Sequence, residues 1–112
     1  MATRMSTREW KQLAVESDYR TQKLAKLVSL SRKQVERIIR REFDSTPRAW
    51  LDERRLLEAG NRLLKGNKVM QVATDLRYKQ ASHFCRQFKE FYGVRPSQFI
   101  RTKRKSQNVA RR

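Results

Sequence analysis

Two stretches of the chain carry polar and charged side chains at matching helical spacings. The positions i, i+4 and i+7 are occupied by Lys33, Arg37 and Arg40 in the first stretch and by Ser82, Arg86 and Lys89 in the second. Residues so spaced lie on one face of an α-helix. An arginine can donate two hydrogen bonds to the O6 and N7 atoms of guanine, and both basic residue types bind phosphate. The two stretches therefore indicate nucleic-acid binding.

The whole chain is strongly basic, with 28 Lys and Arg against 11 Asp and Glu and a net charge of +17 over 112 residues. Such a charge attracts polyanions, chiefly nucleic acids and anionic membranes. No apolar run approaches the roughly 20 residues that a membrane-spanning helix needs, and no signal peptide is expected after Met1. The single cysteine, Cys85, cannot form an internal disulfide and fits a reducing, cytoplasmic compartment. Nucleic acid, and no membrane, is the expected partner.

The elements that position these side chains are predicted to be helices, because only three glycines and two prolines interrupt the chain. Capping boxes at 6–9 and 31–34 mark two helix starts, and Thr46–Pro47 marks a third. Gly66 and Gly93 suit the ends of two helices. The first predicted helix begins after Ser6. Further helices are predicted at about 31–43, 47–65, 68–76 and 80–92. A last helix begins at Pro96 and is expected to fray after about Lys105.

An internal repeat relates residues 24–51 to residues 72–100, with one extra residue in the second copy. Both copies end with an aromatic residue, three residues, proline, two residues, an aromatic residue and an aliphatic one. Each copy has the pattern of a short helix, a tight turn and a longer helix, which is the helix-turn-helix arrangement. The longer helices have apolar faces at Val35, Ile38, Ile39 and Phe43 and at Phe84, Phe88, Phe91 and Tyr92, which are expected to pack inside.

The predicted fold is all-α, with two helix-turn-helix subdomains at about 20–43 and 68–92 joined by a long central helix. A helix over 47–65 spans roughly 28 Å at about 1.5 Å per residue, which could set two recognition helices about one DNA turn apart. One chain, acting as a monomer, would then enter two successive major-groove segments of an asymmetric site. The DNA-binding domain is expected over 1–105, and a disordered basic tail over 106–112.

The exposed faces of the two longer helices supply the expected contacts with double-stranded DNA. Side chains near the helix starts are expected to read base edges, and they are Lys33, Gln34, Glu36, Arg37, Gln80, Ser82 and Arg86. Side chains further along or beside them are expected to hold phosphates, and they are Arg32, Arg40, Arg41, His83, Lys89 and Arg95. Glu36 could accept a hydrogen bond from cytosine or only pair with Arg40, and the residues themselves favour the pairing.

The chain resembles the DNA-binding domain of the AraC/XylS family of bacterial transcription regulators over residues 7–102. The second copy carries the more specific part, in Val72–Ala73, Tyr78, Ser82, Phe84, Arg86, Phe88–Lys89, Gly93 and Pro96–Ser97. The first copy and the central helix contribute Leu24–Ala25, Leu30–Ser31, Arg37, Arg54–Leu56, Ala59 and Leu63–Leu64.

This resemblance implies seven helices, two recognition helices, activation by contact with RNA polymerase, and a place in the bacterial cytoplasm at the nucleoid. The chain looks like the short stand-alone members of the family, or like an excised domain. By position, Lys33, Glu36 and Arg37 match base-facing sites of the first recognition helix, and Ser82 and Arg86 match those of the second.

The chain departs from the family pattern at four positions. The family usually has glycine where this chain has Asp44 and Arg77, a capping residue in place of Lys79, and often Phe in place of Ile39. A left-handed backbone costs a residue such as arginine about 1 kcal/mol or more. The turn before the second recognition helix is therefore expected to differ in shape.

Other functions are less favoured. No catalytic constellation and no Gly-rich phosphate loop is present, and Cys85 with His83 is too small a set for a zinc site, so we expect no enzyme, cofactor or metal. The main alternative is a non-specific nucleic-acid-binding or architectural protein, which the repeat argues against. An RNA-binding module would have an aromatic-studded sheet or a GxxG loop, and a redox-sensing Cys85 is a further alternative.

Overall fold

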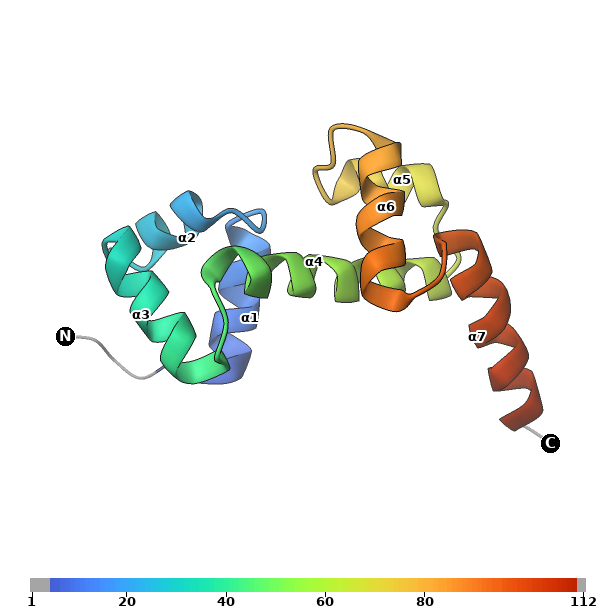
Figure 1. Ribbon diagram of the computed structural model, residues 1–112, viewed down its shortest axis with the longest axis horizontal. Coiled ribbons are helices and arrows are strands. Elements are labelled where there is room, and N and C mark those ends of the chain that lie inside the picture. Colours follow the sequence, from blue (N-terminus) through green and yellow to red (C-terminus); the bar gives the residue numbers. More distant parts are fainter. Residues whose placement is uncertain (1–4, 111–112) are drawn as a thin grey trace. The chain divides into compact units, whose positions relative to one another are not determined.

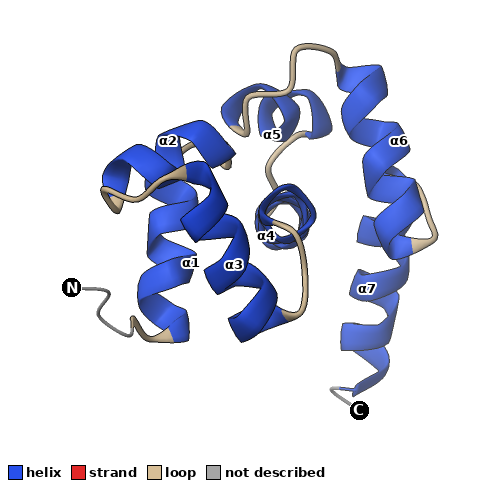
Figure 2. Ribbon diagram, turned by 60° about the vertical axis from the view of Figure 1, so that its left-hand side comes forward, coloured by secondary structure: helices blue, strands red, loops and turns tan. Residues whose placement is uncertain are grey.

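The computed structural model describes residues 5–110, with side chains as far as Lys103. These residues form seven α-helices and no strand (Figure 2), so the predicted all-α fold is confirmed. The helices are α1 (Thr7–Glu16), α2 (Thr21–Leu27), α3 (Arg32–Phe43), α4 (Pro47–Leu64), α5 (Val69–Asp75), α6 (Ala81–Tyr92) and α7 (Pro96–Ala110). The chain divides into two compact units between Arg55 and Leu56, inside α4. No helix in the described part of the chain is long and apolar enough to cross a membrane.

The first unit contains α1, α2, α3 and the start of α4. In Figures 1 and 2, α2 lies across one end of the pair formed by α1 and α3. The side chains buried between these helices are apolar, and they are Trp10, Ala14, Leu24, Ala25, Val35, Ile39, Trp50 and Leu51. Burial of such side chains contributes roughly 25 cal/mol for each Å² of apolar surface removed from water. Of the α3 residues only Val35 and Ile39 belong to this core, so α3 packs against the unit through one face.

Side-chain caps fix the starts of three helices as the sequence predicts. The Ser6 hydroxyl accepts from the Glu9 N–H at 3.2 Å while the Glu9 carboxylate accepts from the Ser6 N–H at 2.9 Å. Ser31 and Gln34 form the same reciprocal pair at the start of α3. Thr46 Oγ1 accepts from the Ala49 N–H at 3.1 Å, next to the proline that opens α4. Each cap satisfies N–H groups that a helix start otherwise leaves unpaired.

The second unit contains the end of α4 and α5, α6 and α7, with α6 in contact with both α5 and α7. Its core is built from aromatic rings. Phe84 and Phe88 are fully buried, and their ring centroids lie 5.7 Å apart in an edge-to-face arrangement. Phe99 of α7 packs edge-on against Phe88 at 5.2 Å. Aromatic pairs of this kind add about 0.5–1.5 kcal/mol beyond the area that they bury.

The two helix-turn-helix turns begin with the same left-handed backbone, but the turn between α5 and α6, over 76–80, is one residue longer than the turn between α2 and α3, over 28–31. Ser29 and Arg77 occupy the same place in the two copies, and both adopt left-handed conformations with φ of 56° and 68°. The hydrogen bonds around them match as well, from the Leu30 N–H to the Ala25 carbonyl at 3.0 Å and from the Tyr78 N–H to the Ala73 carbonyl at 2.9 Å. The left-handed conformation costs a residue with a side chain, such as Arg77, about 1 kcal/mol or more. The backbone hydrogen bonds therefore impose the turn against this cost.

The end of the chain is more helical than the sequence predicts. A disordered tail over 106–112 was expected, whereas α7 continues to Ala110. No glycine or proline follows Pro96, and Lys, Arg, Gln and Ala are good helix formers, so nothing in the local sequence ends the helix earlier. Residues 111–112, and the side chains from 104 onward, lie outside the described residues.

Gly60, near the end of α4, leaves room for the Tyr92 side chain in the second unit. The Tyr92 hydroxyl donates a hydrogen bond to the Leu56 carbonyl at 2.8 Å, and a Cβ atom on Gly60 would lie 2.5 Å from that hydroxyl oxygen. Burial raises the pKa of the Tyr92 phenol, because desolvation disfavours its charged form. Stability from the neutral phenol is therefore fully present below its unfolded pKa of about 10 and is lost as the pH rises through the higher folded pKa.

We expect Gly60→Ala to destabilise the protein, although alanine is the better helix former. Exchanging glycine for alanine gains about 1 kcal/mol in an ordinary helix interior, but the new methyl group would crowd Tyr92, and overpacking costs about 1–3 kcal/mol. Displacing the tyrosine would also break its hydrogen bond, worth about 1 kcal/mol. Urea unfolding should therefore show a net loss of about 1–3 kcal/mol.

Tyr92→Phe provides the control, because it removes the oxygen that Gly60→Ala would meet. The double variant should be less destabilised than the sum of the two single changes. Strict additivity, or a stabilised Gly60→Ala protein, would contradict this account of the close approach.

Candidate nucleic-acid interface

The first recognition helix, α3, is amphipathic and presents a basic face. Val35 and Ile39 are fully buried, which places the residues half a turn away in solvent. Lys33, Arg37 and Arg40 are all exposed, as their spacing predicts. The helix carries five Lys and Arg against two Glu, so it keeps a net positive charge. This is the arrangement of a helix that meets a polyanion.

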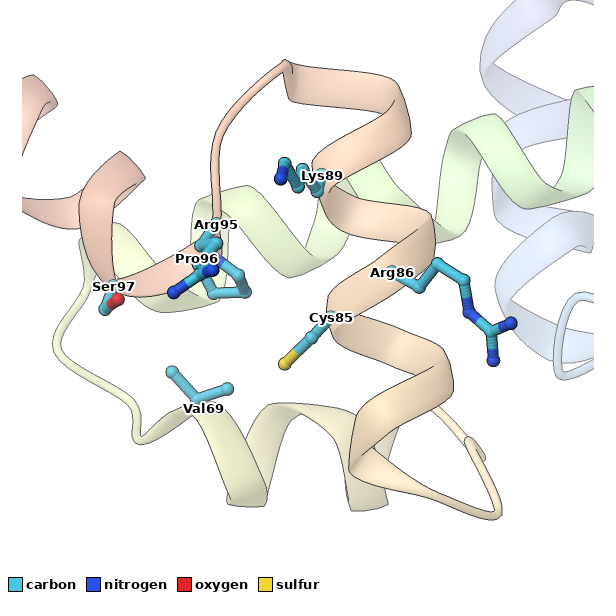
Figure 3. A pocket seen from close by; sticks show the side chains of 7 residues that line it. All are labelled: Val69, Cys85, Arg86, Lys89, Arg95, Pro96 and Ser97. Atoms are coloured by element: carbon cyan, nitrogen blue, oxygen red, sulfur yellow. The ribbon is translucent and has the colours of Figure 1, made fainter.

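The second recognition helix, α6, repeats this arrangement with less charge. Phe84 and Phe88 hold it to the core, and Ser82, Arg86 and Lys89 are exposed. Lys and Arg number two on α6, against one Glu. Figure 3 shows the Arg86 side chain pointing away from the body of the unit. The first helix therefore carries the larger excess of positive charge.

All thirteen residues predicted to contact DNA are exposed, and they are Arg32, Lys33, Gln34, Glu36, Arg37, Arg40, Arg41, Gln80, Ser82, His83, Arg86, Lys89 and Arg95. Exposure is necessary for DNA contact but does not test it, so their division into base and phosphate contacts stays a prediction.

Several of these side chains already have partners. The Gln34 Oε1 accepts from the Ser31 N–H at 2.8 Å, so only its amide nitrogen can serve a base while the cap holds. Arg41 lies 3.2 Å from the carboxylate of Glu42. The ion pair favoured for Glu36 with Arg40 is absent from the described residues. Both side chains are exposed, and an ion pair in water gains little.

The two recognition helices are fixed at their starts by different devices. α3 begins with the Ser31–Gln34 capping box, whereas Gln80, at the start of α6, makes no side-chain cap. In the second unit Tyr78 holds α6 further along the helix. It is 7% exposed, its hydroxyl donates to Gln87 Oε1 at 2.7 Å, and its ring lies 5.1 Å from that of Phe84. One tyrosine thus joins the turn to the middle of α6.

The sequence alone shows Tyr78 as the counterpart of Leu30 in the repeat and as one residue of the family resemblance, and assigns it no role in holding α6. A signal was nevertheless present, because Gln87 stands where the first copy has the apolar Ile38. A tyrosine and a glutamine that replace two apolar residues of one core can satisfy each other by a hydrogen bond.

Tyr78 also reaches the expected DNA surface. The His83 ring packs edge-on against it, with ring centroids 5.6 Å apart. His83 is exposed and stands one residue beyond Ser82 near the start of α6. The described residues contain no cluster of three or more potential metal ligands around this histidine or elsewhere. The ring contact with Tyr78 places the His83 imidazole near the start of α6.

Comparisons with known proteins agree with this geometry. Residues 24–102 match the family described as a helix-turn-helix domain. An uncharacterized HTH-type transcriptional regulator of Haemophilus influenzae is 31% identical over 85 residues, which are 75% of this chain and 28% of that protein. The virulence regulon transcriptional activator VirF of Yersinia enterocolitica is 34% identical over 62 residues, 54% of this chain and 23% of that protein. The chain thus spans about a quarter of the length of these curated relatives.

Solved structures share the fold. The C-terminal domain of AraT, a response regulator from Geobacillus stearothermophilus, superposes with a TM-score of 0.74 at 23% identity, covering 89% of this chain and 88% of that chain. A probable AraC family transcriptional regulator from Rhodopseudomonas palustris gives a TM-score of 0.66 at 22% identity, covering 85% and 94%. The seven-helix arrangement is therefore that of AraC-type domains.

We expect Tyr78→Phe to cost about 1 kcal/mol of stability, because the ring stays in place while the hydrogen bond to Gln87 is lost. A double-mutant cycle with Gln87→Met isolates the pair, since each single change removes the same bond. Urea unfolding of the four proteins should give a coupling energy of roughly 0.5–1.5 kcal/mol. Purely additive changes would show that Tyr78 does not hold α6 through Gln87.

Proposed function

Because the chain belongs to the AraC-type family of helix-turn-helix transcriptional regulators, we propose that it binds double-stranded DNA sequence-specifically and regulates transcription. The family is one of DNA-binding proteins and not of enzymes. The observation that carries the proposal is the repeated unit. Each unit presents a long helix whose one face is buried and whose opposite face carries Arg37 or Arg86 at the equivalent position.

Base recognition is assigned to the first part of each recognition helix. A major groove about 12 Å wide admits one α-helix, and the residues near the start of that helix meet base edges. Arg37 and Arg86 are the best donors for a guanine, which offers two acceptors side by side. Lys33 and Ser82 precede them by one turn. Glu36, without its expected ion pair, is available to accept from a cytosine amino group.

Phosphate contacts are assigned to the cations beside and beyond these positions. Arg32, Arg40 and Arg41 would serve the first helix, and Lys89 and Arg95 the second. Such contacts fix the register of the protein on the duplex without reading its sequence. They also make affinity fall steeply with salt, because each neutralised phosphate releases condensed counterions.

Two recognition helices in one chain would read an asymmetric site as a monomer, in two successive segments of the major groove. The repeat supports this proposal, since each unit has its own core, its own turn and its own exposed basic face. A two-fold-symmetric site, by contrast, is read by two copies of one unit in a dimer.

The regulatory role is proposed to be activation at promoters through contact with RNA polymerase, in the cytoplasm of a bacterium and at its nucleoid. The Yersinia enterocolitica relative is named a transcriptional activator, which supports activation as the sign of regulation. The second candidate function is non-specific nucleic-acid binding in an architectural role, which the net charge of +17 favours.

Alanine substitutions separate base reading from phosphate binding. Arg37→Ala and Arg86→Ala should each cost about 1–3 kcal/mol on the duplex that the chain binds most tightly, and should relax the base preference at one position each. On a shuffled duplex of the same length their effect should be smaller. Fluorescence anisotropy at fixed salt measures both affinities.

Arg41→Ala is the matched control, because it removes an arginine from α3 at a position assigned to phosphate. It should weaken binding to both duplexes alike and lower the slope of log affinity against log salt by about one. Equal losses on both duplexes for all three variants would reject sequence reading and favour the architectural role.

A further inference from the structure

A hollow of about 400 Å³ lies in the second unit, among the start of α5, the middle of α6 and the start of α7. Figure 3 shows it from close by. Its volume falls in the range of sites that bind small molecules, about 300–1,000 Å³. None of the DNA contacts proposed above requires a cavity at this place, so the hollow needs its own explanation.

The walls of the hollow are largely apolar. Val69 of α5, the Pro96 ring and the Cys85 side chain line it. In Figure 3 the Cys85 sulfur points toward Val69, across the hollow. A free thiol packs as a small hydrophobic group, so these three residues offer an apolar surface to a compact hydrocarbon body.

The rim of the hollow is cationic. Lys89 and Arg95 both line it and both are exposed. Among the ion pairs of the described residues, neither Lys89 nor Arg95 has an acidic partner. Ser97 also lines the hollow. Arg86 also belongs to the lining, but its guanidinium is turned away in Figure 3. Two cations without acidic partners thus stand at the edge of an apolar surface.

We propose that this hollow binds a small organic anion, an aromatic carboxylate, with its ring against Val69, Cys85 and Pro96 and its carboxylate between Lys89 and Arg95. A carboxylate accepts charge-assisted hydrogen bonds from both cations, and the ring removes apolar surface from water. Neither feature alone selects this class, since inorganic phosphate lacks the apolar body and a neutral aromatic compound lacks the charge.

Binding in the hollow would oppose binding to DNA. Lys89 and Arg95 are the cations that the proposed function assigns to phosphates, and a carboxylate between them would neutralise both. By thermodynamic linkage, bound DNA must then lower the affinity for the carboxylate by the same factor by which the bound carboxylate lowers the affinity for DNA. This consequence rests on the proposed function, whereas occupation of the hollow does not.

The single cysteine of the chain allows a direct test, with 2-naphthoate as the probe. Alkylation of Cys85 by iodoacetamide, followed by mass spectrometry without DNA, reports whether the hollow is filled. At a probe concentration about ten times its Kd, the alkylation rate should fall about ten-fold, because only the free protein reacts. The cation 2-naphthylmethylammonium and inorganic phosphate should give no comparable protection.

Charge-removing variants locate the probe. Lys89→Gln and Arg95→Gln should each raise the Kd of 2-naphthoate about two- to five-fold, as expected for loss of one exposed ionic contact. Lys65→Gln, which removes an exposed charge of the same unit outside the hollow, should leave the Kd unchanged. Absence of protection, equal protection by phosphate or by the ammonium compound, or an equal effect of Lys65→Gln would overturn the proposal.

A second arm tests the opposition to DNA. 2-Naphthoate should raise the Kd of the wild-type protein for DNA by some factor. DNA should raise the Kd for 2-naphthoate, measured by protection of Cys85, by the same factor. Protection of Cys85 without any loss of DNA affinity would support the site and overturn the opposition. Failure of the proposed function would be separate from both, since it would appear as equal affinity for selected and shuffled DNA without probe.

Discussion

The structure depends on the burial of one face of each recognition helix. Val35 and Ile39 in α3, and Phe84 and Phe88 in α6, are completely removed from water. An α-helix held in this way has only its opposite face to offer a ligand. Lys33 and Arg37, and their counterparts in α6, are exposed for this reason. The same constraint explains why the two copies keep their apolar spacing while their exposed residues differ.

Electrostatics works against the fold and in favour of the complex. A net charge of +17 on 112 residues causes repulsion between like charges in the compact state. On α3, five Lys and Arg outnumber two Glu. The close ion pairs include one on α3, where Arg41 lies 3.2 Å from Glu42, and one on α4, where Glu58 lies 2.7 Å from Arg62. DNA would relieve the repulsion on α3 and α6, so binding and stability should be coupled. This coupling follows from mass action, because only the folded protein presents both helices.

Most of the fold follows from local signals in the sequence. Ser6, Ser31 and Thr46 mark helix starts because their side chains accept from N–H groups that the helix leaves unpaired, and each forms the expected bond. The repeat identifies the two units because apolar periodicity determines which face is buried. The exposed site residues could be named for the same reason, since exposure is the complement of that periodicity.

The rest depends on contacts between residues that no local pattern connects. Arg77 keeps the left-handed turn because the hydrogen bonds around it favour the turn more than the side chain opposes it. Tyr78 holds α6 through Gln87, nine residues away. The hollow beside Cys85 is formed by three helices, and no single stretch of sequence describes it. The length of α7 was underestimated because a basic composition was taken to indicate disorder, although lysine and arginine are compatible with a helix.

The most direct test of the central claim is selection of duplexes from a random-sequence library at near-physiological salt. Salt suppresses the charge-driven component of binding, which is blind to sequence. If two recognition helices read DNA, the selected duplexes should share an asymmetric motif with two conserved segments about one turn, ~34 Å, apart. Absence of any enriched motif, with affinity that only declines as salt rises, would contradict sequence-specific recognition and leave a basic protein that binds any polyanion.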